Sequence, residues 1–201
     1  MDPLSAVSLA LAVIGTAGTI YFGFKAQRLE RRIRRFDWDD VLTGVKTVSK
    51  QVSRDSRPDL MLSVSGPGSI VSNLLLTETS THVPLYVAIS QRADETQHPC
   101  RPHYRVTMQT TKWRTYIPDD VFAFKDKRIL VCDDCVLSGD TMAALTKVLV
   151  DNGFERRNIT TMALFVTDVA RSANKAPDFF WFEVPDSDFY LPWGRSLGRG
   201  F

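Results

Sequence analysis

RILVCDDCVLSGDTMAAL, residues 128–145, combines an apolar run, two adjacent carboxylates, a tight turn and the start of a helical pattern. The apolar run at residues 129–132 predicts a buried strand, and the apolar residues after the turn recur at helical spacing. The first N–H groups of a helix have no partner within the helix, and the helix dipole adds positive potential there. The sequence therefore predicts an anion site at the turn, next to the carboxylates of Asp133 and Asp134.

An anion site beside two carboxylates suits a ribose 5-phosphate, because carboxylates accept hydrogen bonds from vicinal hydroxyls. The order of apolar run, Asp-Asp, three residues and Ser-Gly-x-Thr resembles the phosphoribosyl pyrophosphate motif of type I phosphoribosyltransferases. The resemblance implies that Asp133 and Asp134 are the catalytic pair and hold the ribose hydroxyls. It implies that the 5-phosphate binds at Ser138, Gly139, Asp140 and Thr141. The alternative is an ordinary strand–turn–helix unit whose aspartates only shape or cap the turn.

A second glycine-rich turn follows the apolar residues 60–64, and a helical pattern begins after it at residue 70. In phosphoribosyltransferases the corresponding turn holds pyrophosphate. The resemblance assigns this role to Ser65, Gly66, Gly68 and Ser69. Many purine members resemble Ser-Arg-Gly-Gly here, whereas this turn has no basic side chain, so its backbone N–H groups would have to hold the anion.

Apolar segments that suit strands alternate with helical patterns through the middle of the chain. Asp37 is a plausible N-cap for a helix whose apolar face comprises Trp38, Val41, Leu42, Val45, Val48 and Val52. Further strands are predicted at residues 83–90 and 159–167. This order predicts an α/β fold with a parallel sheet flanked by helices, and ligands bind at the carboxyl ends of such strands.

Residues 91–127 form a long polar stretch between two of these strands. Such stretches are usually functional or disordered. In the family, a loop from this region closes over the reaction centre. The side chains that could reach into the site are Lys112, Trp113, Arg114 and Tyr116. A solvated hairpin is the alternative.

The C-terminal residues 164–193 resemble the base-binding hood of bacterial xanthine-guanine phosphoribosyltransferases. The resemblance implies that Arg171 meets an exocyclic oxygen of a purine and that Phe189 stacks on the base. Core packing for Phe189 and a surface position for Arg171 are the alternatives. Leu137 stands where 6-oxopurine enzymes have an aspartate that contacts the base, and an apolar side chain cannot make that contact, which argues against a 6-oxopurine substrate.

Residues 4–24 contain no charged side chain and are long enough to cross a bilayer core of about 30 Å. Asp2 precedes this run and six basic residues follow it before residue 36, which predicts a single-pass anchor with the globular domain in the cytoplasm. A cleaved signal peptide or a buried helix is the alternative. The predicted organisation is a membrane anchor at 1–24, a basic linker helix at 25–36 and a phosphoribosyltransferase-like domain at 37–201, with a small hood at about 168–201.

Composition excludes several other classes of protein. The net charge of +2 is concentrated in the basic linker, so the globular part is not a basic body and a nucleic-acid partner is not expected. The three cysteines make no disulfide framework, and the CxxC of Cys132 and Cys135 spans the Asp pair, which argues against a zinc site. The 201 residues allow one domain plus an appendage.

These observations lead to two hypotheses of different classes. The first is a membrane-anchored enzyme that transfers ribose 5-phosphate from phosphoribosyl pyrophosphate to a nucleobase, with a purine as the expected base and Mg²⁺ as the cofactor. The second is a catalytically weakened nucleotide sensor on the same fold, favoured by Leu137, Asp140 and the altered pyrophosphate turn. The expected partners are the lipid bilayer and further copies of the chain.

Overall fold

The computed structural model describes residues 34–80, 82–92, 103–109, 113–185 and 188–196. The chain forms two compact units. The larger is Asp37–Ser187, and the smaller joins residues up to Phe36 with Asp188–Phe201.

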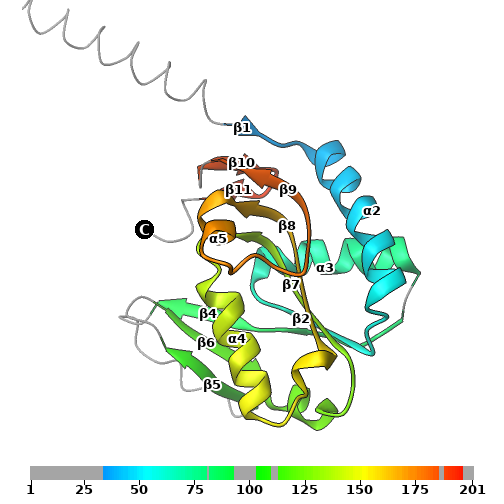
Figure 1. Ribbon diagram of the computed structural model, residues 1–201, viewed down its shortest axis with the longest axis vertical. Helices are drawn as coiled ribbons and strands as arrows, with labels where there is room; N and C mark the ends of the chain where they lie inside the picture. The colour runs from blue at the N-terminus through cyan, green and yellow to red at the C-terminus, as the bar shows by residue number, and fades with distance from the viewer. Residues whose placement is uncertain (1–33, 81, 93–102, 110–112, 186–187, 197–201) are drawn as a thin grey trace, which may run out of the picture. The chain divides into compact units, whose positions relative to one another are not determined.

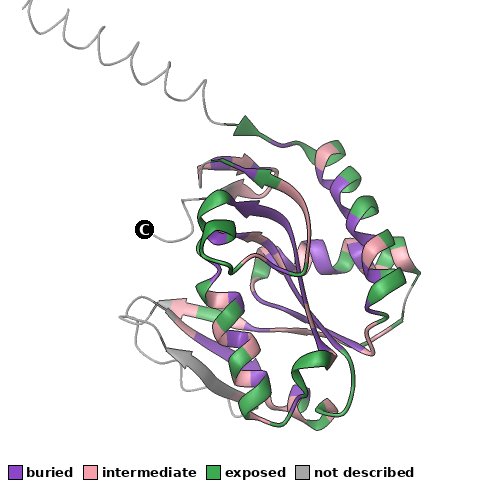
Figure 2. Cartoon of the chain, viewed as in Figure 1, coloured by how far each residue is buried: buried purple, intermediate pink, exposed green. Residues whose placement is uncertain are grey.

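The larger unit is built on a five-stranded parallel sheet, which confirms the predicted α/β fold class (Figure 1). The strand order is β3 (Leu85–Val87), β2 (Leu60–Ser63), β7 (Ile129–Val136), β8 (Ile159–Thr167) and β9 (Phe179–Val184). The central strands β7 and β8 are buried along most of their length (Figure 2). Burial on both faces explains why their sequences are continuous apolar runs rather than alternating ones.

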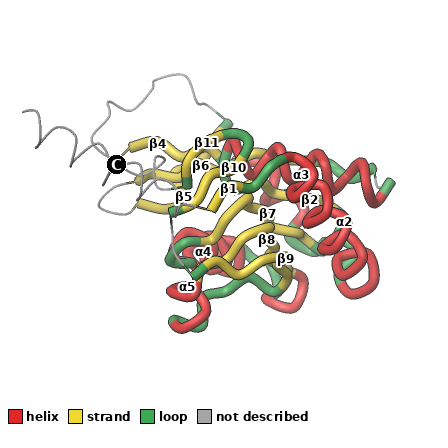
Figure 3. The backbone as a smooth tube through the Cα atoms, turned by 90° about the horizontal axis from the view of Figure 1, so that it is seen from above, coloured by secondary structure: helices red, strands yellow, loops and turns green. Residues whose placement is uncertain are grey.

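Helices cover both faces of this sheet (Figures 1 and 3). On one face, α4 (Asp140–Asp151) buries Met142, Leu145 and Leu149 in a core shared with β2 and β7. The other face carries α2 (Trp38–Asp55) and α3 (Gly66–Thr79). Close packing there depends on Gly44, because a Cβ at that position would lie 2.5 Å from Cε3 of Trp181 in β9.

Helix α2 begins as the sequence predicts. The Asp37 side chain accepts a hydrogen bond from the Asp40 N–H at 2.9 Å, and Asp40 accepts one from the Asp37 N–H at 3.1 Å. This reciprocal capping box satisfies two donors that the helix leaves unbonded. The predicted apolar face is too wide, however, because Trp38 and Leu42 are 50% and 41% exposed.

The polar stretch after β3 forms part of a second, antiparallel sheet. Its order is β4 (Ile89–Arg92), β6 (Trp113–Pro118) and β5 (Tyr104–Gln109). Of the side chains predicted to reach into the site, Tyr116 instead lies within strand β6 of this sheet. Tyr116 is 2% exposed and donates its hydroxyl to Oε1 of Gln91 at 3.3 Å, while Lys112 lies outside the described residues.

Short elements complete the larger unit. They are η1 (Asp119–Phe124), η2 (Arg156–Asn158) and α5 (Asp168–Ser172). Helix α4 ends at Asp151, and Gly153 follows with a φ of +100°, in agreement with the predicted C-terminal signal.

The smaller unit contains a three-stranded sheet in the order β1 (Arg34–Arg35), β10 (Phe189–Leu191) and β11 (Gly194–Arg195). Strand β1 runs parallel to β10, so the prediction of a helix through residue 36 is wrong at its last residues. Phe36 packs edge-to-face on Phe189, with ring centroids 5.9 Å apart.

The predicted membrane anchor and most of the basic linker lie outside the described residues. Within the part of the chain that the structure describes, no helix has both the length and the apolar character needed to cross a membrane.

Candidate functional site

The predicted pyrophosphate turn meets the predicted Asp pair at the carboxyl end of β2. Parallel pairing of these strands places the turn after β2 beside Asp133. The Ser65 hydroxyl donates to Oδ1 of Asp133 at 3.0 Å and accepts from the Gly68 N–H at 3.0 Å. The same Asp133 oxygen accepts the Asp134 N–H at 2.9 Å. One hydrogen-bonded chain therefore links the start of α3 to the Asp pair.

Gly68 is needed for this close approach. It is buried, and a Cβ at this position would lie 3.0 Å from Oγ of Ser63 and 3.1 Å from Oδ1 of Asp133. Both distances are tighter than ordinary van der Waals contact. The absence of a side chain thus lets the first turn of α3 pack directly against the end of β7. In the same turn, Gly66 faces open space and Ser69 donates its hydroxyl to the Gly66 carbonyl at 2.5 Å.

The two aspartates lie in different surroundings. Asp134 is 1% exposed, whereas Asp133 is partly exposed. Burial, the neighbouring charge of Asp134 and a hydrogen bond between the two side chains raise the pKa of Asp133 well above its usual value. Asp133 therefore retains its proton to higher pH than an ordinary aspartate. In this arrangement Asp133 is the carboxyl group of the pair that a ligand can reach, and Asp134 lies in the interior.

The predicted phosphate turn after β7 already contains a carboxylate. Gly139 adopts a φ of +77°, and the Ser138 hydroxyl donates to Oδ2 of Asp140 at 2.9 Å. Lys175 Nζ donates to Oδ1 of Asp140 at 2.6 Å, and this hydrogen bond is the main cause that lowers the pKa of Asp140. Thr141 follows in the first turn of α4 and is partly buried. The helix N-terminus thus carries its own anion, whose charge Lys175 offsets.

Lys175 is a site residue that the sequence did not reveal. Its backbone lies against the turn, because a Cβ on Gly139 would come within 2.4 Å of the Lys175 carbonyl oxygen. Thr167 fixes this arrangement from β8: its hydroxyl donates to the Leu137 carbonyl and accepts the Ala170 N–H at 3.2 Å. No local pattern marks Lys175, since only the pairing of β7 with β8 brings it to the turn.

The predicted base-binding residues Arg171 and Phe189 belong to different units of the chain. Arg171 pairs with Glu183 of β9 at 3.0 Å and lies over the Phe180 ring at 5.5 Å, with half of its side chain exposed. Phe189 belongs to the smaller unit, is 1% exposed and packs on Phe36. The core-packing alternative describes Phe189 in this structure, because a buried ring offers no face to a base.

Comparisons with solved structures bear on the fold. A purine phosphoribosyltransferase from Pyrococcus horikoshii is 17% identical, with a TM-score of 0.58, over 80% of this chain and 94% of that one. A xanthine-guanine-hypoxanthine phosphoribosyltransferase from Helicobacter pylori is 19% identical, with a TM-score of 0.57, over 83% and 96%. A hypothetical protein from Neisseria gonorrhoeae with bound ppGpp is 18% identical, with a TM-score of 0.58, over 80% and 89%.

No protein-family model and no curated protein matches the sequence. The similarity is therefore one of fold, at low sequence identity. The solved structures that it resembles include purine, xanthine-guanine and adenine phosphoribosyltransferases, as the sequence motif led us to expect. The chain thus has the α/β fold of type I phosphoribosyltransferases.

Proposed function

We propose that the protein transfers ribose 5-phosphate from phosphoribosyl pyrophosphate to a nucleobase, with a purine as the expected base, and releases pyrophosphate. The observation that carries the proposal is the hydrogen bond between Ser65 and Asp133, which joins the pyrophosphate turn to the Asp pair at the carboxyl edge of the sheet. Ligands of α/β proteins bind at this edge.

Each part of the site has a role in this proposal. The N–H groups at the start of α3 bind pyrophosphate, and those around Ser138 and Thr141 bind the 5-phosphate. Asp133 accepts a ribose hydroxyl and stabilises positive charge that develops on the sugar. Arg171, half exposed beside Glu183, is the candidate donor to the base. Phe189 has no part in the proposal, because its ring is buried.

Mg²⁺ fits this site only if protein carboxylates and the substrate phosphates bind the ion together. Among the described residues, no three acidic, histidine or cysteine side chains gather into a metal site. Mg²⁺ typically keeps several waters and binds one or two carboxylates together with substrate phosphates. Asp133 would hold the ion through water, whereas Asp134, which was predicted to share this role, is buried. The ion would neutralise the charge of the pyrophosphate oxygens.

Asp134→Asn tests the proposal. Asparagine has nearly the same shape, so the fold should persist, while the loss of charge from the pair should abolish detectable turnover. Pyrophosphate release is measured with phosphoribosyl pyrophosphate, Mg²⁺ and a panel of bases. The full chain is required, because removal of residues 1–35 would delete β1. A variant that keeps wild-type turnover would refute the assignment.

A second function, a nucleotide sensor without turnover, is favoured by the contact between Asp140 and Lys175. A carboxylate that occupies the phosphate turn opposes the binding of another anion. The interior position of Asp134 and the lack of a basic side chain at residues 65–69 point in the same direction. The resemblance to a protein with bound ppGpp makes a phosphorylated nucleotide the ligand to test first.

Asp140→Asn separates these two functions. Removal of the negative charge should tighten the binding of phosphoribosyl pyrophosphate or ppGpp by up to about fivefold. An enzyme would then show a higher kcat/KM for phosphoribosyl pyrophosphate, whereas a sensor would bind more tightly without pyrophosphate release. Asp151→Asn is the matched control, because Asp151 also pairs with a lysine but lies at the far end of α4. Equal effects of both substitutions would contradict the role given to Asp140.

We also propose that residues 4–24 anchor the protein in a membrane with the domain in the cytoplasm, and that copies of the chain associate. The uncharged run and the basic residues after it support the anchor. Retention of the full chain in the membrane fraction after alkaline carbonate extraction is expected. Release into the supernatant would contradict the anchor, and cross-linking of the membrane fraction tests association.

A further inference from the structure

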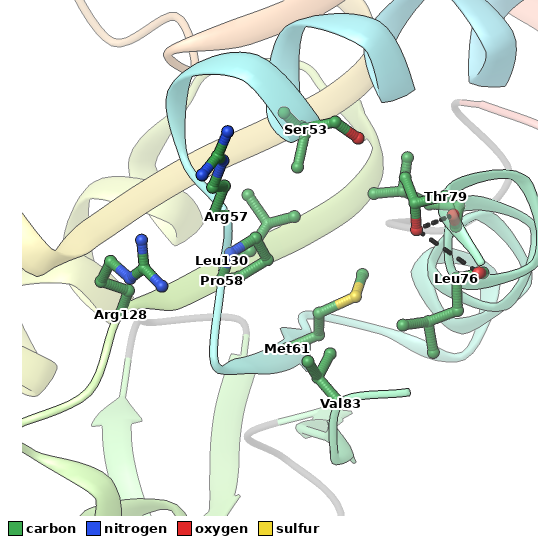
Figure 4. Close-up of a pocket in the computed structure, with 11 residues that line it drawn as sticks. Ser53, Arg57, Pro58, Met61, Leu76, Thr79, Val83, Arg128 and Leu130 are labelled. Atoms are coloured by element: carbon green, nitrogen blue, oxygen red, sulfur yellow. Dashed lines mark hydrogen bonds between the residues drawn. The ribbon is translucent and has the colours of Figure 1, made fainter. Parts of the chain in front are cut away.

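A cavity of about 330 Å³ opens at the amino-terminal edge of the parallel sheet (Figure 4). It lies between the last turns of α2 and α3 and the starts of β2 and β7, where Val52, Leu76, Met61 and Leu130 contribute to its wall. Asp133 lies toward the other end of β7. The cavity is therefore separate from the proposed reaction centre.

The walls of the cavity are mostly apolar, and most of their side chains belong to helices and strands. Met61 in β2, Leu75 in α3 and Leu130 in β7 are each at most 2% exposed. Side chains that are packed this tightly within strands and a helix have fixed positions. The cavity is thus a preformed apolar space, and its volume lies at the lower end of the range for small-molecule pockets, about 300–1,000 Å³.

Two arginines lie together at one side of this space, and Leu76 and Thr79 lie at the other (Figure 4). The guanidinium of Arg128 is neutralised by Asp59, with Nε 3.2 Å from Oδ2 and Nη2 3.3 Å from Oδ1. Arg57 is exposed, and no ion pair between described residues includes it. The polar side of the cavity therefore carries one cation whose charge is available to a ligand.

The backbone of Arg57 gives an independent reason to assign it a function. Arg57 follows the C-cap of α2 with a φ of +44°, and its N–H donates to the Val52 carbonyl at 3.1 Å. Glycine is the usual residue at this position, because a Cβ makes left-handed backbone less favourable. Strained residues of this kind concentrate at ligand-binding positions.

We propose that this cavity binds a small amphiphilic monoanion, a carboxylate on an apolar chain or ring. The carboxylate pairs with Arg57, and the apolar body lies against Leu76 and Val83, which line the cavity and are partly exposed. One available cation matches one negative charge, and the limited volume favours a single short chain over a macromolecular segment. The site is independent of the proposed transferase reaction.

Titration calorimetry of the full chain with octanoate, and with octanol as its neutral counterpart, tests this site. Octanoate should bind at one site per chain and more tightly than octanol. Arg57→Gly removes the cation and also relieves the positive φ, so thermal stability should be kept while octanoate binds about tenfold more weakly. Arg157→Ala is the charge-matched control, since Arg157 pairs with Glu155 on the surface, and it should bind octanoate as the wild type does.

Leu76→Trp provides a second, apolar test, because a larger side chain at the wall reduces the free volume of the cavity. Octanoate and octanol should then both bind more weakly. Unchanged octanoate affinity in Arg57→Gly and Leu76→Trp would overturn the proposal. Equal affinities of the wild type for octanoate and octanol, or no octanoate binding at millimolar concentration, would also overturn it.

Discussion

Asp133→Asn is expected to lower turnover at least about 100-fold while it raises stability at neutral pH. Burial and the adjacent Asp134 raise the pKa of Asp133, so ionisation of this carboxyl group destabilises the folded state. Asparagine removes that charge but can still accept the hydrogen bonds of Ser65 and of the Asp134 N–H through its Oδ1. The loss of turnover follows because a neutral amide cannot stabilise positive charge on the sugar.

The pH dependence gives this prediction a definite sign. A group whose folded-state pKa is raised lowers stability as the pH rises from the unfolded value, about 4, through the raised folded value. The advantage of Asp133→Asn over the wild type should therefore be absent below about pH 4 and should grow as the pH rises toward the raised folded-state pKa. Urea unfolding of both proteins at acidic and neutral pH measures this difference in the free energy of unfolding.

Asp126→Asn is a suitable control for this experiment, because Asp126 is exposed in the turn before β7. It should change neither the stability nor the turnover. A gain in stability for Asp133→Asn that is the same at both pH values, or a loss at neutral pH, would contradict the raised pKa. Retained turnover would remove Asp133 from the reaction.

Gly139→Ala is expected to destabilise the larger unit by about 3 kcal/mol. Two costs add at this position. The φ of +77° disfavours any residue with a Cβ, and the new methyl would lie 2.4 Å from the Lys175 carbonyl oxygen and from its Cβ. Relief of this clash requires the backbone at Lys175 to move away from the turn, which would also separate Lys175 Nζ from Asp140. Denaturant unfolding of the full chain measures the loss.

Gly66→Ala is the matched control, because a Cβ on Gly66 meets no atom within 4 Å and its backbone φ is not positive. As the first residue of α3, it should change stability by less than about 0.5 kcal/mol. If Gly139→Ala unfolds at the same denaturant concentration as Gly66→Ala, the contact between Lys175 and the turn is absent in solution.

The predicted strand–turn–helix units were correct where the signals are local. The apolar run at residues 129–132 lies in strand β7, as predicted. The predicted stop signal Asn152-Gly153 follows the last residue of helix α4. Local periodicity was less reliable at α2, where Trp38 and Leu42 share the helical spacing but are exposed. The spacing of apolar residues shows that one face of the helix is apolar. How much of that face is buried depends on the neighbouring elements α3 and β9.

The success of site prediction from the sequence also depends on how far apart in the chain the interacting residues lie. Ser65 and Asp133 were predicted to share a site, because residues that follow parallel strands meet at one edge of the sheet. The interior position of Asp134 and the core position of Phe189 were not predictable, since each depends on residues far away in the chain. Phe189 has the same aromatic character whether it stacks on a base or on Phe36.

The sequence by itself determined the strand–turn–helix units that carry the two glycine-rich turns and the parallel arrangement of their strands, because these follow from backbone geometry and from the spacing of apolar residues. Only the tertiary structure decided the electrostatics of the site. It brought Lys175 to Asp140, left Arg57 without an ion pair among the described residues, and gave the adjacent aspartates different surroundings. The energy of a charge depends on which atoms surround it, and those atoms come from segments that only folding brings together.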